Sequence, residues 1–241
     1  MKNITTIAVK ELYTYFVSPI AYFVLFIFMG VSGFLFSWIL LGMSVNSEPS
    51  ALVMESLFGI MSFLLLFFVP AMTMKLFAEE RKSGTIELLL TSPITDVEVV
   101  LGKFLAGWLL LAIMLLLTLL FPLLITPFGA PDIGPIISGY LGLFLLGAAF
   151  IALGVMISSM SKNQIVSAIT SFGLLLFLWI AGSLSNRWGG VGDLLAYLSL
   201  SNHFQDFARG IVSLKHAVYY LSFTTVCLFV TVKSIESSKW R

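Results

Sequence analysis

The sequence predicts an all-α integral membrane protein with six transmembrane helices. Of its 241 residues, 59% are hydrophobic and only 10% are charged, and the mean hydropathy is +1.04. A soluble domain of this size does not need so much apolar surface. Six apolar runs have the length of about 20 residues that a helix needs to cross a bilayer. We expect one transmembrane domain over residues 1–241, with spans near 20–42, 51–74, 104–125, 138–160, 164–184 and 216–232.

The basic residues of the chain are unevenly divided between the two sides of this topology. The side that holds both termini carries Lys2, Lys10, Lys75, Arg81, Lys82, Lys103, Lys162, Lys233, Lys239 and Arg241. The opposite side carries Arg187, Arg209 and Lys215. Because Lys and Arg accumulate in cytoplasmic loops, ten against three predicts that both termini are cytoplasmic.

Before the first span, residues 3–17 predict an amphipathic helix. The apolar positions that recur at helical spacing include Ile4, Ile7, Leu12, Tyr15 and Phe16. Such a helix lies in the plane of the membrane interface rather than across the bilayer. Ser18-Pro19 then reads as an N-cap followed by proline at the first helical position, so the chain turns there and enters the membrane.

The connection between spans two and three, residues 77–103, is long and charged. The stretch Phe77–Phe104 holds eight of the chain's 25 charged residues. Span two should end at Gly84, residues 91–93 (Thr-Ser-Pro) should break the chain, and the Thr95–Glu98 capping box should start the next helix. Between the breaks we expect a short helix whose leucines, residues 88–90, would be exposed to water unless another surface covers them. It is either a docking surface for a cytoplasmic partner or a solvated loop with snorkelling charges.

Three stretches carry a family resemblance: ELYTYFVSPIAYFV (11–24), FAEERKSGTIELLLTSPI (77–94) and LGKFLAGW (101–108). Together they resemble the permease subunits of ABC-2 type ABC transporters, most closely the gliding-motility type. The resemblance implies six helices with both termini inside, in the inner membrane of a bacterium. It also implies a cytoplasmic ATPase, a second copy or related permease forming a dimer, and an auxiliary subunit with a large external portion.

In that family the loop between spans two and three contains the coupling helix, which seats in a groove of the ATPase. The residues that match its motif are Glu79, Glu80, Arg81, Gly84, Thr85, Glu87 and Leu88. The resemblance implies ionic steering and docking for the acids and Arg81, a hinge at Gly84 and a buried anchor at Leu88. The interfacial helix would pack beside this segment and couple its motion to the first span.

The chain itself should bind no nucleotide. Its Gly102-Lys103 pair is followed by Phe104, and Val97 stands where a P-loop requires its earlier glycine. ATP and Mg²⁺ are therefore expected on the partner ATPase, and this chain is expected to be neither an enzyme nor the holder of a cofactor. The net charge of +1 gives no support for nucleic-acid binding.

Two alternatives for the outer segment, residues 185–215, stay open. His203 and Asp206 are three residues apart, which would allow a metal site or a membrane-embedded enzyme if His216 joined them. The better-supported interpretation is an amphipathic re-entrant or interfacial helix over residues 201–213, and no metal site is expected.

Within the spans, small residues and prolines predict packing and bends. Gly147 and Gly154 lie in the fourth span and favour close helix contact or a sliding surface. Pro70 and Pro122 should bend the second and third spans, with neighbouring helices supplying the freed backbone contacts.

A non-transporting scaffold that anchors an ATPase would have nearly the same sequence features as a permease. The apolar spans argue against a small hydrophilic cargo and favour an amphipathic one or force transmission.

Overall fold

A computed structural model describes residues 2–46, 50–85, 94–126, 132–184 and 189–238, and these residues form a helical bundle. The helices are α1 (Lys2–Val17), α2 (Pro19–Asn46), α3 (Ser50–Thr73), α4 (Lys75–Ser83), α6 (Asp96–Thr118), α7 (Leu120–Ile125), α8 (Ile133–Met160), α9 (Gln164–Leu184), α10 (Gly189–Leu198), α11 (Leu200–Ala208) and α12 (Leu214–Ser238). Among them the structure contains six helical stretches long and apolar enough to cross a membrane, as the six apolar runs predicted.

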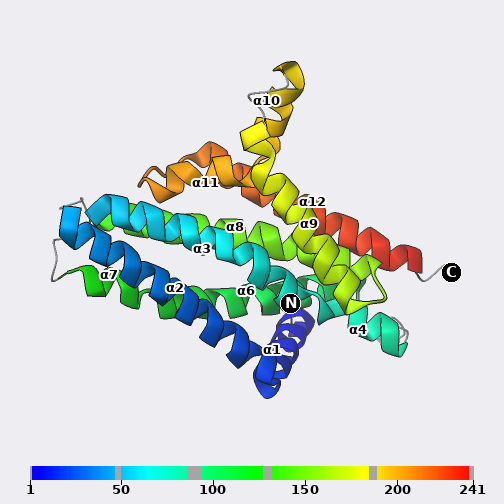
Figure 1. Cartoon of the computed structure of the whole chain (residues 1–241). Coiled ribbons are helices and arrows are strands. Elements are labelled where there is room, and N and C mark those ends of the chain that lie inside the picture. Colours follow the sequence, from blue (N-terminus) through cyan, green and yellow to red (C-terminus); the bar gives the residue numbers. More distant parts are fainter. Residues whose placement is uncertain (1, 47–49, 86–93, 127–131, 185–188, 239–241) are drawn as a thin grey trace.

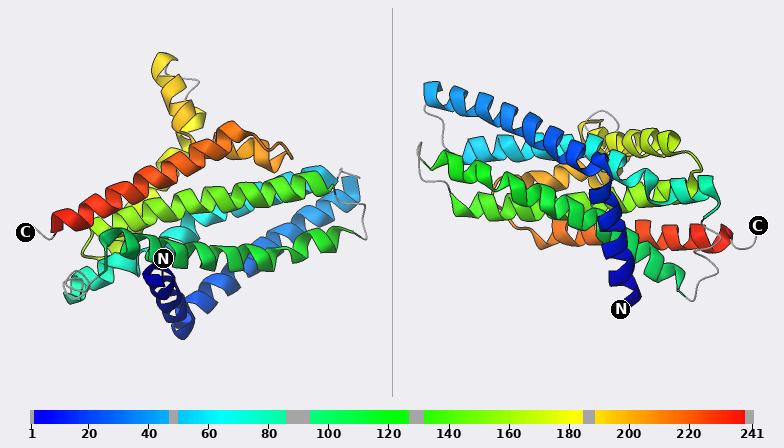
Figure 2. Two further views of the ribbon diagram at one scale, coloured as in Figure 1. Left: turned by 180° about the vertical axis from the view of Figure 1, so that it is seen from behind. Right: turned by 90° about the horizontal axis from the view of Figure 1, so that it is seen from below.

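The long helices α2, α3, α6 and α8 run side by side along one axis, and α1 crosses that axis at a steep angle (Figures 1 and 2). Helices α1 and α4 and the C-terminal end of α12 lie toward one end of the bundle, whereas α7 and the start of α3 lie at the other (Figure 1). Helix α2 begins at Pro19, where proline was expected at the first helical position.

Helix α6 extends beyond its apolar run, because its N-terminal cap rather than hydropathy sets where it begins. Helix α6 starts at Asp96, two turns before the apolar run that begins near Phe104. The predicted capping box is present: the Glu98 amide donates to Thr95 Oγ1 over 3.3 Å, and the Thr95 amide donates to Glu98 Oε2 over 3.1 Å. The first turns of α6 therefore need no apolar sequence to be helical.

Helix α8 is the most buried of the long helices and packs against α3, α6, α9, α11 and α12. Its glycines permit this close contact. A Cβ atom at Gly147 would overlap Leu111 of α6, and one at Gly154 would overlap Thr73 of α3. Small residues at these positions let neighbouring backbones approach, and the gain in dispersion contact holds helices together where water is absent.

The break between α6 and α7 follows from Pro122. A proline ring clashes with the carbonyl four residues earlier and donates no hydrogen bond to it. That carbonyl belongs to Thr118, and it accepts a hydrogen bond from the Tyr140 hydroxyl at 2.8 Å. A neighbouring helix thus supplies the contact that proline removes, as predicted.

Residues after α9 form two short helices before the last long one. Helix α10 points away from the bundle, whereas α11 lies along it (Figure 1). The expected helix over residues 201–213 is shorter in the structure, ending at Ala208, because Gly210 adopts a positive φ of 95°. Ser199 caps α11 by accepting from the Asn202 amide at 3.3 Å.

Candidate coupling site

The second long helix bends where α3 passes into α4, and a serine from α8 holds the bend. Ser158 Oγ accepts hydrogen bonds from the amides of Phe77 (3.1 Å) and Ala78 (3.2 Å) and donates to the carbonyl of Met74 (3.0 Å). A hydroxyl has one donor and two acceptor positions, so Ser158 uses all of them. We call residues 72–80 the α3–α4 junction.

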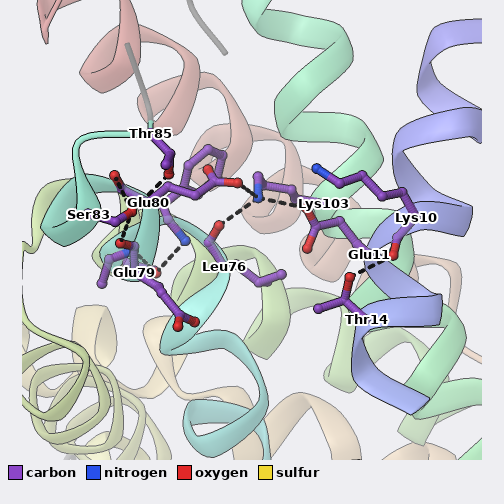
Figure 3. A network of polar contacts seen from close by, with 12 residues as sticks. Lys10, Glu11, Thr14, Leu76, Glu79, Glu80, Ser83, Thr85 and Lys103 are labelled. Carbon is purple, nitrogen blue, oxygen red and sulfur yellow. Dashed lines mark hydrogen bonds and ion pairs between the residues drawn. The ribbon is translucent and has the colours of Figure 1, made fainter. Parts of the chain in front are cut away.

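A lysine from α6 binds the same junction. The Nζ atom of Lys103 lies 2.7 Å from the carbonyl of Leu76, 2.7 Å from Glu80 Oε1 and 2.9 Å from Glu11 Oε1 (Figure 3). The lysine side chain is 1% exposed. An ammonium group has three donors, and here each has an oxygen partner. The ammonium also lies 5.1 Å from the centre of the Phe77 ring, within cation–π range.

The Lys103 cluster joins three separate elements through one buried charge. Glu11 belongs to α1, Glu80 to α4 and Lys103 to α6. The glutamates are 14% and 19% exposed, so they lie at the edge of the bundle rather than in its interior. Removing one partner of such a pair leaves an uncompensated charge, which makes the geometry costly to disturb.

Helix α1 supplies the third contact to the junction. The hydroxyl of Tyr15, which is 1% exposed, donates to the carbonyl of Met72 at 2.6 Å. Burial, and secondarily the nearby Glu11 carboxylate, raises the pKa of the Tyr15 phenol, which therefore stays a neutral donor. The Lys75 ammonium lies 4.8 Å from the centre of the Tyr15 ring. Side chains from α1, α8 and α6 thus bind the carbonyls of Met72, Met74 and Leu76, at alternate residues of the bend.

A family model described as an ABC-2 family transporter protein matches residues 5–239. The chain belongs to the ABC-2 transporter family. No curated protein sequence matches it. Membership over nearly the whole chain, together with the six apolar helices, makes this ABC-2 protein a multi-pass membrane protein consistent with a transporter permease.

In this ABC-2 protein, five of the seven residues predicted for coupling lie in the described part of the chain. Glu80 faces inward to Lys103, whereas Glu79 and Thr85 are exposed and Arg81 is half-buried. Gly84 ends α4 with a positive φ of 74°, at the predicted helix end. The other two predicted coupling residues are Glu87 and Leu88, which lie outside the described residues.

The predicted apolar face of α1 is directed toward the bundle. Ile7, Leu12 and Phe16 are partly buried and pack against the core, and Ile4 is half-buried. A Cβ atom added at Gly102 of α6 would overlap Ile7, so the absence of a side chain there lets α1 cross close to α6. The seating of α1 depends on this close approach.

The sequence interpretation missed Lys103, Glu11 and Ser158 as parts of the site. Lys103 was counted as a cytoplasmic basic residue and excluded as part of a P-loop, although a lysine at the edge of an apolar run should have suggested a partner. Ser158 is one of few hydroxyl-bearing residues within the apolar runs, and no partner was predicted for it. An unpaired hydroxyl in lipid is costly, which was the available clue to its contacts.

The histidines and the aspartate of residues 185–216 lie together: His216 pairs with Asp206, and His203 stacks on Tyr219 beside them. His216 Nε2 lies 2.8 Å from Asp206 Oδ2, and the His203 and His216 ring centres are 4.9 Å apart. His203 Nδ1 donates to the Ser199 carbonyl at 2.9 Å, and its ring stacks on Tyr219 with centres 3.8 Å apart. Within the described ranges, no group of three or more His, Cys, Asp or Glu residues is arranged to hold a metal ion.

Proposed function

We propose that this chain is the membrane-spanning permease subunit of an ATP-driven ABC-2 transporter. A separate cytoplasmic ATPase would bind ATP and Mg²⁺ and dock on the segment that follows α4. The permease would convert closure of that ATPase into a rearrangement of its helices for export or transmembrane work. Family membership supports the permease role, and the α3–α4 junction supports the coupling role.

The junction is suited to transmit force because its contacts reach three other helices. A displacement of α4 acts on Tyr15 of α1, Lys103 of α6 and Ser158 of α8 through short hydrogen bonds to the bend. These bonds lie in a mostly buried setting, where breaking one leaves an unsatisfied polar group. A movement of α4 is therefore expected to move α1, α6 and α8 with it. The hydrogen-bonded bend is the single observation on which the coupling role depends.

The topology, assembly and cellular setting follow the same proposal. Both termini would be cytoplasmic in the inner membrane of a bacterium, with α1 in the membrane interface. Two permeases, identical or related, would pair with two ATPases. A gliding-motility type system with an auxiliary subunit of large external portion is the setting that the quoted motifs favour. No nucleic acid would take part.

The proposal is tested by co-purification with the cognate ATPase. The double variant Glu87→Lys with Leu88→Asp reverses a charge and removes an apolar anchor in the docking segment. We expect it to abolish recovery of the ATPase while the permease stays in the membrane. The matched control is Asp193→Lys with Leu194→Asp, the same chemical changes on two exposed residues of α10. The control should retain the ATPase, and normal recovery with the Glu87 and Leu88 variant would overturn the docking assignment.

A second measurement separates a permease from a scaffold. Stimulation of the ATPase by an amphipathic cargo presented in the bilayer is expected for a transporter. A scaffold would retain the ATPase without any such stimulation by cargo.

A further inference from the structure

A small pocket with polar groups in its lining lies between α3, α9 and α11. Helix α11 and the start of α3 lie toward the end of the bundle opposite α4 (Figure 1). Its cavity volume is about 230 Å³. One face of α3 and one face of α11 form its walls, and Trp179 of α9 also lines it. We call this cavity the α3–α11 pocket. Its volume is below the roughly 300–1,000 Å³ of pockets for drug-sized ligands, so it suits a small chemical group.

The charged groups of the α3–α11 pocket offset one another. Arg209 Nε of α11 donates to Glu55 Oε1 of α3 over 2.9 Å, and the two side chains are 57% and 33% exposed. Because the guanidinium and the carboxylate neutralise each other, the pair adds no net charge to the pocket, which favours a neutral ligand over either kind of ion.

The remaining polar groups both donate and accept hydrogen bonds. In the described part of the chain, the Gln205 side-chain amide and the Trp179 indole N–H have no hydrogen-bond partner. The hydroxyls of Ser62 and Ser201 donate to backbone carbonyls at 2.7 and 2.8 Å, which leaves their oxygens able to accept. A hydroxyl-bearing ligand, whose groups also donate and accept, matches this mixture better than a purely accepting or donating group.

Space for such a ligand is created by Gly59, which lines the α3–α11 pocket between Glu55 and Ser62 on α3. A Cβ atom built at Gly59 would meet no atom within 4 Å. By contrast, the space beside glycines of α8 such as Gly154 is occupied by neighbouring side chains. A larger residue at Gly59 would therefore occupy the cavity itself rather than disturb helix packing.

We propose that the α3–α11 pocket binds a neutral, hydroxylated head group of the size of a single sugar residue. The indole of Trp179 would pack against its apolar C–H face, and Gln205 would bond its hydroxyls. This inference deepens the proposed permease function, on which it rests, by naming the chemistry of a cargo or ligand. The head group can come from a lipid-linked sugar or from a free sugar, and the two sources are distinguished experimentally.

The test uses the permease in lipid nanodiscs with its tryptophans replaced by 5-fluorotryptophan and read by fluorine NMR. The Trp179→Phe variant assigns the resonance among the five tryptophans of the chain. The discs contain phosphatidylcholine alone, with monoglucosyl diacylglycerol, or with phosphatidylglycerol, and a further sample receives methyl β-glucoside in solution. No ATPase is present, so a failure here is distinguishable from a failure of ATPase docking.

We expect the Trp179 resonance to shift with a glucosyl compound and not with phosphatidylglycerol. A shift with the glycolipid alone identifies a lipid-linked group, and a shift with methyl β-glucoside identifies a free sugar. Gly59→Leu should abolish the shift, whereas Gly173→Leu, at another open glycine on α9, should preserve it. Gln205→Ala should weaken binding about fivefold, as expected for loss of one hydrogen-bonding group.

Three results would overturn the proposal. One is an equal shift with phosphatidylglycerol, another is the absence of a shift with both sugars, and the third is a shift that persists in Gly59→Leu.

Discussion

The variant Lys103→Met keeps much of the length of the side chain but removes the cation that Glu11 and Glu80 share. It also leaves the Leu76 carbonyl without the donor that lies 2.7 Å away. Two carboxylates would then remain close together with no positive charge between them. We expect this variant to be the most destabilising single change at the α3–α4 junction.

The expected magnitude follows from burial. Removing one partner of a buried ion pair costs about 3–5 kcal/mol. Because Glu11 and Glu80 are 14% and 19% exposed, water can solvate them in part, which places the cost near the lower end, about 3 kcal/mol. The triple variant Lys103→Met, Glu11→Gln, Glu80→Gln removes the unpaired charges and should recover part of this loss.

The assay is unfolding of the purified permease in mixed detergent micelles, followed by tryptophan fluorescence, for the single and triple variants. Lys103→Arg is a useful comparison, since it keeps the charge but changes its geometry. A loss below about 1 kcal/mol for Lys103→Met would be typical of a surface pair and would contradict the buried assignment. Equal stability of the single and triple variants would show that charge is not the cause.

Three further predictions concern packing and pH. Ser158→Ala should cost about 2 kcal/mol, because buried amides lose their acceptor. Ser183→Ala, which removes an exposed hydroxyl, should change the unfolding free energy by less than about 0.5 kcal/mol, and similar values for both would refute the role of the bend. Gly154→Ala should destabilise the protein by about 1–3 kcal/mol, because the added methyl group would overlap Thr73. Gly173→Ala should be neutral or stabilising, because its methyl group would meet no atom within 4 Å. A lower thermal midpoint for Gly173→Ala than for Gly154→Ala would be inconsistent with the packing of α8. Burial lowers the pKa of His203, so protonation favours the unfolded state and stability should fall as pH drops below about 6.5. The variant His203→Phe should flatten the dependence of the thermal midpoint on pH, and an unchanged slope would argue against this assignment.

Much of the fold follows from the sequence because lipid imposes a simple length rule. Six apolar runs predicted six candidate spans, and the capping box at Thr95 and the helix end at Gly84 are both present. The apolar runs alone do not give the helix ends: α8 begins at Ile133 and α12 at Leu214, before the runs expected from residues 138 and 216. The start of α6 was predicted from its capping box rather than from hydropathy.

The site was less predictable, because its contacts join residues far apart in the chain. Lys103 meets Glu11 and Glu80 across separations of 92 and 23 residues, and Ser158 meets Phe77 across 81. No local pattern reports such pairs. The sequence offered only indirect evidence for the site. Polar side chains such as Lys103 and Ser158 lie inside or beside apolar runs, where a polar group requires a hydrogen-bond partner.

The central claim, that an ATPase contacts the segment leaving α4, is tested most directly by photocrosslinking in cells that contain the whole system. A photoreactive amino acid at the exposed position Thr85 should give an adduct with a polypeptide that carries a P-loop. The same reagent at Tyr197, which is 57% exposed on α10, should give no such adduct. Adducts from Thr85 with lipid alone, or ATPase adducts from Tyr197 instead, would contradict the account.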